Sequence, residues 1–337
     1  MDWFERLMGF RETSYDDTRA RLKVEGSRLQ SLVNGKSYGV GELELVSLQR
    51  LRERVKSSGG PPGRLKASVV TGDVRQMHQS PEYAGALFQV ASQFNLLEMV
   101  SSSVTPDDGV TRYRNDPTQG PACAIAAGAA TIYRNYFAPV GGGYGQTIDR
   151  QFDGLAELGE ALKSALNKPV KDLWKMQNGY ALCTRAGLDA IVKHLEKLKP
   201  EQIDILRAKL RIGMQSDVEV TDAKREPRQI VSQAFCSALP VAYTAIPSVH
   251  WEPFATLVLE AACEATMWAA VLNARRGNCN TVLLTFLGGG SFGNEDRWIY
   301  GAIRRALKMV SGFDLDVRLV SYREPSQDVL RIAEDFH

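Results

Sequence analysis

Residues 281–294 read Thr281-Val-Leu-Leu-Thr-Phe-Leu-Gly-Gly-Gly-Ser-Phe-Gly-Asn294, and this stretch is the most informative in the 337-residue chain. Its apolar first half predicts a buried strand over 281–287. The glycines that follow predict a loop over 288–296, which leads into a helix over 297–310. Such a loop presents backbone N–H groups to an anion, and the dipole of the following helix assists. We therefore expect it to contact a phosphate, although a tight turn without a ligand is compatible with the same residues.

Strands and helices alternate on both sides of this stretch. Apolar runs predict further strands, and longer apolar or amphipathic segments predict helices. The expected strands cover 67–71, 86–91, 229–236 and 314–322, and the expected helices include 122–130 and a packed helix over 252–275. This alternation predicts an α/β layer fold.

Two regions lie outside this pattern. Residues 1–66 are polar and basic, and leucines at helical spacing predict a helix over 40–58. From about 147 to 228 the pattern becomes helical and charged, with helices expected over 151–167, 184–197 and 200–212. We therefore divide the chain into an N-terminal helical extension, residues 1–66, and a domain over 67–337 that carries a helical insertion at about 147–228.

The charges of the chain nearly cancel, because 41 Lys and Arg residues stand against 39 Asp and Glu residues, a net charge of +2. This balance provides no broad field for nucleic acid or an anionic membrane, so we expect neither as a partner. The chain has five scattered cysteines and four histidines, which argues against a disulfide framework and a dedicated metal site. No resident cofactor is predicted. The N-terminus lacks the apolar core of a secretory signal, and we expect a cytoplasmic protein.

The glycine-rich loop also matches two other motifs. Gly288-x-Gly290-x-x-Gly293 fits the dinucleotide fingerprint, but only one strand–helix–strand unit fits after residue 280, whereas that fold usually begins with this unit. Gly289-x-Ser291-x-Gly293 fits the nucleophile elbow of serine hydrolases, in which the histidine follows the serine. The only later histidine here is the last residue, His337. A serine hydrolase is therefore disfavoured, and an NAD-dependent oxidoreductase stays as a lesser alternative.

Four motifs, taken in order, resemble those of macrodomains. Val70-Thr-Gly-Asp73-Val looks like the Gly-Asp-Ile turn of that family, and Gln89-Val-Ala-Ser-Gln-Phe-Asn95 occupies the place of its Asn-Ala-Ala-Asn strand end. Gly120-Pro-Ala-Cys-Ala-Ile125 resembles its glycine-rich loop entering a helix, and residues 288–293 resemble its Gly-x-Gly-aromatic-Gly loop. The resemblance covers 67–137 and 229–322, and it implies a three-layer α/β/α fold around a mixed sheet.

Macrodomains bind ADP-ribose, and some hydrolyse it from proteins. The resemblance implies that Asp73 accepts a hydrogen bond from the adenine amino group and that Val74 donates its backbone amide. Asn95 would lie near the distal ribose, which Phe292 would cover, and the loops at 120–123 and 288–293 would clamp the diphosphate. The ADP-ribose-binding residues implied in this way are Asp73, Val74, Asn95, Gly120, Ala122, Cys123, Gly288, Gly289, Gly290, Ser291, Phe292, Gly293 and Asn294.

The loops of this resemblance are rich in carboxylates. Cleavage of an N-glycosidic bond needs a carboxylate that activates water or stabilises an oxocarbenium-like centre. Asp116 and Asp108 are the first candidates for this role, followed by Glu98 and Asp296. Each of the first three also has an ordinary structural interpretation: a turn for Asp108, an Asx-turn or helix cap for Asp116, and a solvated strand end for Glu98.

An acid-rich site around the distal ribose suits a cationic guanidinium leaving group. In this respect the chain resembles the arginine-specific macrodomain hydrolases typified by a Legionella effector that acts on ADP-ribosylated ubiquitin. The resemblance implies an ADP-ribosylhydrolase that removes mono-ADP-ribose from an arginine side chain, with an ADP-ribosylated protein such as ubiquitin as its partner. A non-catalytic ADP-ribose reader with the same fold is the main alternative.

Overall fold

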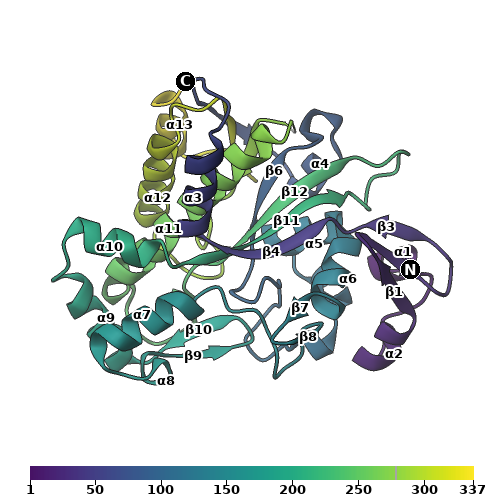
Figure 1. Cartoon of the computed structure of the whole chain (residues 1–337), viewed down its shortest axis with the longest axis horizontal. Helices are drawn as coiled ribbons and strands as arrows, with labels where there is room; N and C mark the ends of the chain where they lie inside the picture. The colour runs from purple at the N-terminus through teal and green to yellow at the C-terminus, as the bar shows by residue number, and fades with distance from the viewer. Residues whose placement is uncertain (278) are drawn as a thin grey trace.

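The structure is a computed structural model that describes residues 1–277 and 279–337. Its centre is a seven-stranded sheet (Figure 1) in the order β4-β11-β12-β6-β13-β14-β5. In that order the strands span Glu42–Ser47, Arg211–Glu219, Ile230–Cys236, Leu87–Ala91, Thr281–Leu284, Asp316–Ser321 and Lys66–Thr71. The strands from β12 to β5 are parallel, whereas β11 runs antiparallel to both β12 and β4. The carboxyl ends of the parallel strands therefore meet at one edge, where open α/β sheets bind ligands.

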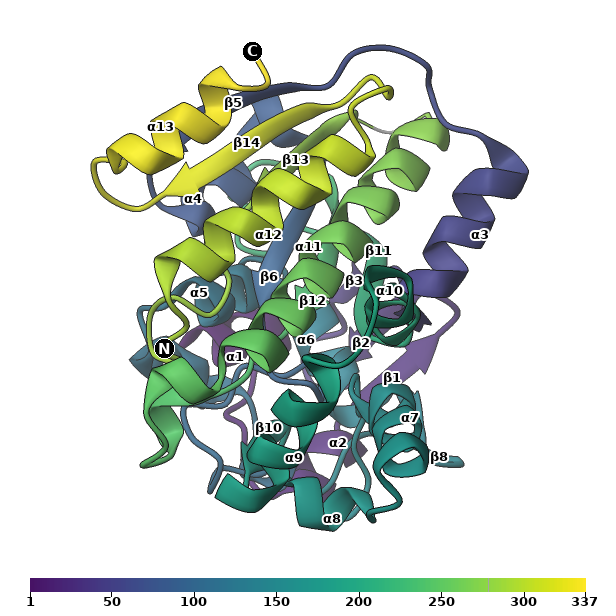
Figure 2. The same ribbon diagram turned by 90° about the vertical axis from the view of Figure 1, so that its left-hand side faces the viewer.

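Helices cover both faces of the sheet (Figure 2), and each face has its own apolar core. Strand side chains alternate between the two cores, so that Leu87 of β6 packs on one side and Phe88 on the other. The first core includes α3 (Leu48–Ser58), α11 (Glu252–Arg275), α12 (Asp296–Met309) and α13 (Gln327–Glu334), and the second includes α4 (Val74–Gln79), α5 (Gln119–Ala126) and α6 (Gly128–Tyr136). The expected three-layer α/β/α fold with a mixed sheet is confirmed.

Helix α11 is the longest element of the fold. By length and composition it could cross a membrane, but 78% of its most apolar stretch is buried inside the protein. It packs against the sheet between its neighbours α3 and α12, and its buried Glu264 pairs with Arg52 of α3 and Arg305 of α12 (Figure 2). The expected packed helix over 252–275 is therefore confirmed as a core helix.

The first 66 residues contain strands as well as helices, and the predicted helix over 40–58 is wrong in its first half. In Glu42-Leu-Glu-Leu-Val46 charged and apolar residues alternate, and this period of two lets the segment pair with β11 as β4. Helix α3 begins only at Leu48, with the Ser47 hydroxyl as its N-cap. The preceding elements are α1 (Trp3–Met8), α2 (Tyr15–Ala20) and the small antiparallel sheet of β1 (Leu22–Glu25), β2 (Arg28–Ser31) and β3 (Ser37–Gly39).

The segment expected to be a helical insertion is also of mixed structure. A hairpin of β9 (Trp174–Gln177) and β10 (Tyr180–Cys183) lies between its helices, and the last part of the segment is β11 of the main sheet. The predicted helix over 200–212 therefore ends early, because Arg211 already pairs with Ser47 of β4. The helices are α7 (Ala156–Leu166), α8 (Val170–Leu173), α9 (Arg185–Leu195) and α10 (Pro200–Arg207), and a short hairpin of β7 (Pro139–Val140) and β8 (Gly143–Tyr144) precedes them.

Candidate functional site

A groove with two chambers opens at the carboxyl ends of the parallel strands. The first chamber, of about 220 Å³, lies beyond β6, β12 and β13, and the second, of about 480 Å³, lies beyond β5 and β14. We call them the Glu98 chamber and the Asp73 chamber, after a carboxylate that lines each. The residues that line both chambers are Asp116, Thr118, Gln119, Thr285 and Phe286. The two chambers therefore adjoin along the start of α5 and the loop after β13.

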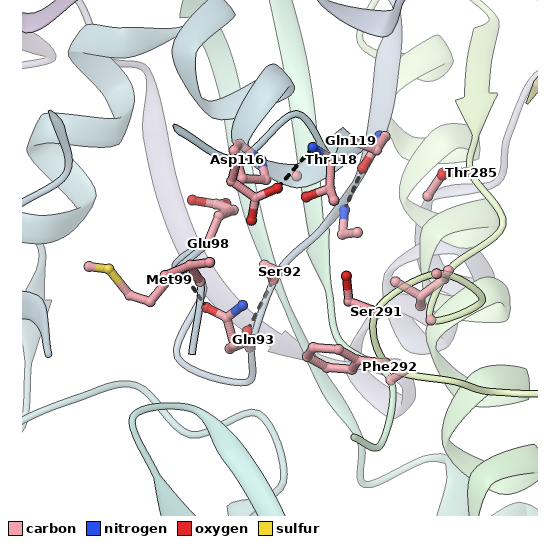
Figure 3. Close-up of a pocket in the computed structure, with 18 of the residues that line it drawn as sticks. Ser92, Gln93, Glu98, Met99, Asp116, Thr118, Gln119, Thr285, Ser291 and Phe292 are labelled. Carbon is pink, nitrogen blue, oxygen red and sulfur yellow. Dashed lines mark hydrogen bonds between the residues drawn. The ribbon is translucent and has the colours of Figure 1, made fainter. Parts of the chain in front are cut away.

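Two carboxyl groups line the Glu98 chamber (Figure 3). Glu98 is buried, at 2% exposure, and both its oxygens accept a hydrogen bond from Nη2 of Arg134 at 3.2 Å. Burial raises the pKa of Glu98 to about 7, although the positive charge and the hydrogen bond of Arg134 oppose this. Asp116 is half-buried, and its Oδ1 accepts a hydrogen bond from the backbone N–H of Thr118 at 2.9 Å. A carboxyl group that titrates near neutral pH therefore shares the chamber with a more exposed one.

A tight turn after β6 presents Glu98 to its chamber. Leu96 in this turn has φ +66°, a left-handed conformation that is uncommon for a leucine. The turn is fixed from within, because the backbone N–H of Met99 donates to Oε1 of Gln93 at 2.8 Å. It is also fixed from outside, since the backbone N–H of Glu98 donates to Oη of Tyr113 at 3.0 Å. The Glu98 carboxyl is thus held in place by its backbone before any ligand arrives.

The N-terminus of α5 forms the wall between the two chambers. The Gln119 side chain ties it to β6, accepting from the N–H of Ala91 at 2.9 Å and donating to the carbonyl of Gln89 at 2.8 Å. Gly120 allows α5 to lie this close to β6, because a Cβ at this position would stand 2.0 Å from the carbonyl oxygen of Ala91. The first-turn N–H groups of a helix have no acceptor within the helix, and the helix dipole favours negative charge there. This wall therefore suits an anionic group that spans both chambers.

The glycine-rich loop after β13 closes the opposite side of the Glu98 chamber. Its lining members are Gly288, Gly290, Ser291 and Phe292. Gly288 has φ +80°, which a residue with a side chain rarely adopts. Asn294 holds the loop from below, because its Nδ2 donates to the carbonyls of Leu239 at 2.9 Å and Gly288 at 3.2 Å. Figure 3 shows Ser291 and Phe292 across the chamber from Glu98 and Asp116.

Three aromatic rings line the same chamber and pack against one another. Phe292 of the glycine-rich loop lies 5.4 Å from Tyr180 and 5.5 Å from Tyr243, measured between ring centroids. Tyr180 belongs to β10, and its Oη donates to the carbonyl of Met99 at 2.6 Å. The hairpin within the 147–228 segment therefore contributes a wall of the site. Aromatic faces of this kind favour a sugar ring or a cation beside them.

The Asp73 chamber is more open. Asp73 caps α4, with its Oδ1 accepting from the N–H of Arg75 at 2.7 Å, and Val74 follows it in the chamber wall. Phe286 and Tyr322 add aromatic rings, and Tyr322 is 75% exposed. An exposed aromatic ring beside an acidic side chain and a backbone amide suits a flat heteroaromatic base with both donors and acceptors.

The structure brings many of the sequence-predicted residues to this groove. Glu98, Asp116, Gly120, Gly288, Gly290, Ser291 and Phe292 line the Glu98 chamber, and Asp73, Val74, Ala122 and Asp116 line the Asp73 chamber. Asp116 takes part in an Asx-turn to Thr118, as its structural interpretation predicts, and still faces both chambers. Glu98 is not a solvated strand end but a buried side chain.

Two of the predicted carboxylates lie outside both chambers. Asp108 is exposed in a short 3-10 turn, and its Oδ2 accepts from the N–H and the hydroxyl of Thr105 at 2.8 and 3.0 Å. Asp296 is exposed in the first turn of α12, where an acidic residue complements the helix dipole. Both positions are explained by local backbone chemistry, and the structure does not bring these two predicted residues to the groove.

Five of the predicted binding residues also lie away from the chamber walls. Asn95 is fully buried, with its Nδ2 donating to Oε1 of Gln151 at 2.8 Å, so it braces the turn. Cys123 is buried within α5, and its sulfur accepts from Nε2 of Gln119 at 3.2 Å. The remaining three, Gly289, Gly293 and Asn294, shape the glycine-rich loop from behind.

Several lining residues carry no motif that a single sequence reveals. They are Thr118, Gln119, Tyr180, Tyr243 and Tyr322. Gln119 directly precedes the motif that begins at Gly120, and this adjacency was the one available signal. Tyr180 comes from a hairpin 82 residues after Glu98 in the chain, so its place in the wall depends on tertiary packing. Within residues 1–277 and 279–337, no group of three or more His, Cys, Asp and Glu side chains could hold a metal ion.

No protein-family profile matches the chain, and no curated protein matches it. Among solved structures, it is similar to poly(ADP-ribose) glycohydrolase from Deinococcus radiodurans in complex with ADP-ribose, with 12% identity and a TM-score of 0.47 over 87% of this chain and 93% of that one. It is also similar to poly(ADP-ribose) glycohydrolase from Thermomonospora curvata, with 12% identity and a TM-score of 0.42 over 91% and 92% of the two chains.

Proposed function

We propose that this protein is an ADP-ribosylhydrolase that removes mono-ADP-ribose from an arginine side chain of a protein. The observation that carries the proposal is the joint placement of Glu98 and Asp116 in a chamber that adjoins a second chamber across the start of a helix. One chamber suits a base and its ribose, the shared wall suits a diphosphate, and the other chamber holds the carboxyl groups for chemistry on a second ribose.

The shape and chemistry of the groove support ADP-ribose as the ligand. The adenine would lie in the Asp73 chamber, with the Asp73 carboxylate accepting from the amino group and Tyr322 against the base. The diphosphate would lie at the start of α5 and along the loop at 288–291, where backbone N–H groups and a helix dipole hold an anion without a basic surface. This agrees with a chain whose net charge is only +2.

The carboxyl groups support hydrolysis of the glycosidic bond. The ionised Glu98 carboxylate would take a proton from a water molecule as the water oxygen bonds to the anomeric carbon of the distal ribose. The bond from that carbon to the guanidine nitrogen breaks, and the released guanidine recovers the proton as arginine. Asp116 would stabilise the oxocarbenium-like transition state by its negative charge.

Arginine as the modified residue is supported by the walls of the Glu98 chamber. A substrate guanidinium is a delocalised cation that binds carboxylates and aromatic faces well. The chamber offers two carboxyl groups together with the rings of Tyr180, Tyr243 and Phe292. The proposed specificity is that of the arginine-specific hydrolases that act on ADP-ribosylated ubiquitin. Ubiquitin is therefore the first carrier protein to test.

The experiment is a turnover assay of the full-length protein on proteins mono-ADP-ribosylated at arginine, aspartate or serine. We expect ADP-ribose release from the arginine substrate at a rate well above that from the other two. Release from the aspartate or serine substrate alone would contradict the arginine assignment and retain the hydrolase. Binding of ADP-ribose with no release from any substrate would make the protein a reader, and tight binding of NAD in place of ADP-ribose would favour an oxidoreductase.

A further inference from the structure

The buried side chain of Arg134 grips the turn that carries Glu98. Arg134 lies on α6 and is fully buried. Its Nε donates to the carbonyl oxygen of Leu96 at 2.7 Å, and its Nη2 donates to both oxygens of Glu98. One guanidinium therefore holds the residue with left-handed backbone in the turn and also the carboxyl group that the turn presents.

The same guanidinium is fixed from the opposite side by the sheet. Its Nη1 donates to Oε1 of Gln215 on β11 at 3.0 Å, and its centre lies 3.8 Å from the ring centroid of Phe235 on β12. The Gln215 amide is itself held, because its Nε2 donates to the carbonyl of Val40 at 2.9 Å. The planar fork of Arg134 is thus clamped in one orientation, which a flexible lysine could not reproduce.

Arg134 is also the one cation that faces Glu98 within the described part of the chain. The other titratable groups around this carboxyl are the Tyr113 phenol, the Cys123 thiol and the Asp116 carboxyl across the chamber. Burial raises the pKa of both Tyr113 and Cys123 well above their usual values, so both stay neutral near pH 7. The charge that balances an ionised Glu98 therefore comes from Arg134.

We propose that Arg134 is a positioning residue of the active site, which holds the strained turn over 93–98 and keeps the Glu98 carboxylate charged and aimed into its chamber. This inference rests on the proposed function, because Glu98 must be ionised to accept a proton from water. Arg134 itself does not line the chamber, so it would act through Glu98 and the turn that carries it.

The test compares R134Q and R134K with the wild-type protein, and R52Q serves as a control. Arg52 also pairs with a buried glutamate, Glu264, but between α3 and α11 and outside both chambers. The Glu98 carboxyl is titrated in the free protein by NMR of 13C-labelled glutamate, with E98Q used to assign its resonance. The pH dependence of kcat is measured on the arginine substrate with the same variants.

In R134Q we expect the titration midpoint of Glu98 and the rising limb of kcat to move together to higher pH, by about one to three pH units. R134K keeps the charge and loses the fork, so its midpoint stays near that of the wild type while kcat falls. R52Q moves neither midpoint. In R134Q, kcat could instead fall equally at every pH while the titration midpoint of Glu98 stays at its wild-type value. Arg134 would then have only a structural role, and this result would overturn the inference.

R134K carries the test if R134Q fails to fold, and a wild-type kcat in R134K would also overturn the inference. The NMR titration needs no substrate, so it separates the inference from the proposed function. A protein that shows the shifted midpoint but cleaves no ADP-ribosylated substrate would contradict the proposed hydrolase and not the influence of Arg134 on Glu98.

Discussion

The carboxyl groups of this chain differ in whether they accept hydrogen bonds from the backbone of their own loop. The carboxyl group of Glu98 is held by the side chains of Arg134 and Tyr113 rather than by a cap or turn of its own backbone. Asp108, in contrast, is committed to Thr105. Both types look alike in a polar loop sequence, because a carboxylate that forms a turn and one that lines a chamber have the same kinds of neighbours. For this reason the sequence could nominate Glu98 and Asp116 but could not separate them from Asp108 and Asp296.

The first prediction concerns Asp116. We expect D116N to lower kcat by about 10²- to 10⁴-fold on the arginine substrate, because the amide cannot stabilise positive charge in the transition state. Its structural hydrogen bond to Thr118 can be kept by the amide oxygen, so the fold should persist. The measurement is steady-state release of ADP-ribose.

The matched controls for Asp116 are D108N and D296N, which change exposed carboxyl groups outside both chambers. Both should retain a kcat close to that of the wild type. If either control lost as much activity as D116N, the division of the carboxyl groups by their place in the groove would be wrong.

The second prediction concerns pH. The pKa of Glu98 is raised by burial to about 7, and only the ionised form can take a proton from water. Protonation below that value removes the base, so kcat should be low in acid and rise as the pH passes through about 7. A kcat profile measured from pH 5 to 9 in constant ionic strength checks this, and a flat profile across neutral pH would contradict the assigned role.

At the scale of elements, the strand–loop–helix unit over 281–310 was readable because three signals coincide there. The apolar run predicts a strand, the glycines predict a loop and the amphipathic pattern predicts a helix, and no other assignment fits all three. The segment at 42–47 misled for the opposite reason, since its leucines fit both a helical face and a strand with alternating sides. The partner β11 decides between the two, and it lies 164 residues further along the chain, from Ser47 to Arg211.

The third prediction compares two glycines of the groove. A Cβ on Gly120 would stand 2.0 Å from the backbone oxygen of Ala91, so G120A must push α5 away from β6. Overpacking of this kind costs about 1–3 kcal/mol, and the displaced helix start should weaken ADP-ribose binding. A Cβ on Gly290 would meet no atom within 4 Å, so G290A should fold as the wild type does. Urea unfolding of both variants tests the difference in stability, and equal losses of stability in the two would refute the account of α5.

At the scale of the whole molecule, distant segments assemble one groove. The Glu98 chamber takes its walls from the ends of β6 and β13, from α5 and from the β9–β10 hairpin. The layer fold was predictable because alternating strands and helices admit few arrangements. The role of Tyr180 could not be predicted, because the sequence of a short hairpin inside a charged helical segment does not show which surface the hairpin packs against.

The fourth prediction concerns the ion network that joins the helical layer. Buried Glu264 of α11 binds Arg52 and Arg305, and Asp204 of α10 binds both arginines from the other side. Removing one partner of a buried ion pair costs about 3–5 kcal/mol, and R52Q should lie near the lower figure because Arg305 stays with Glu264. We expect a lower free energy of unfolding in urea with unchanged kcat and KM at a temperature where the variant is folded. A change in kcat with unchanged stability would show that this network reaches the groove.

The central claim is that Glu98 performs chemistry on an ADP-ribose that other residues hold. The most direct measurement pairs ADP-ribose binding by calorimetry with ADP-ribose release from modified arginine, for wild-type protein and E98Q side by side. We predict that E98Q binds ADP-ribose with an affinity close to that of the wild type and releases it from the arginine substrate about 10²- to 10⁴-fold more slowly. Release by E98Q at the wild-type rate would contradict the account.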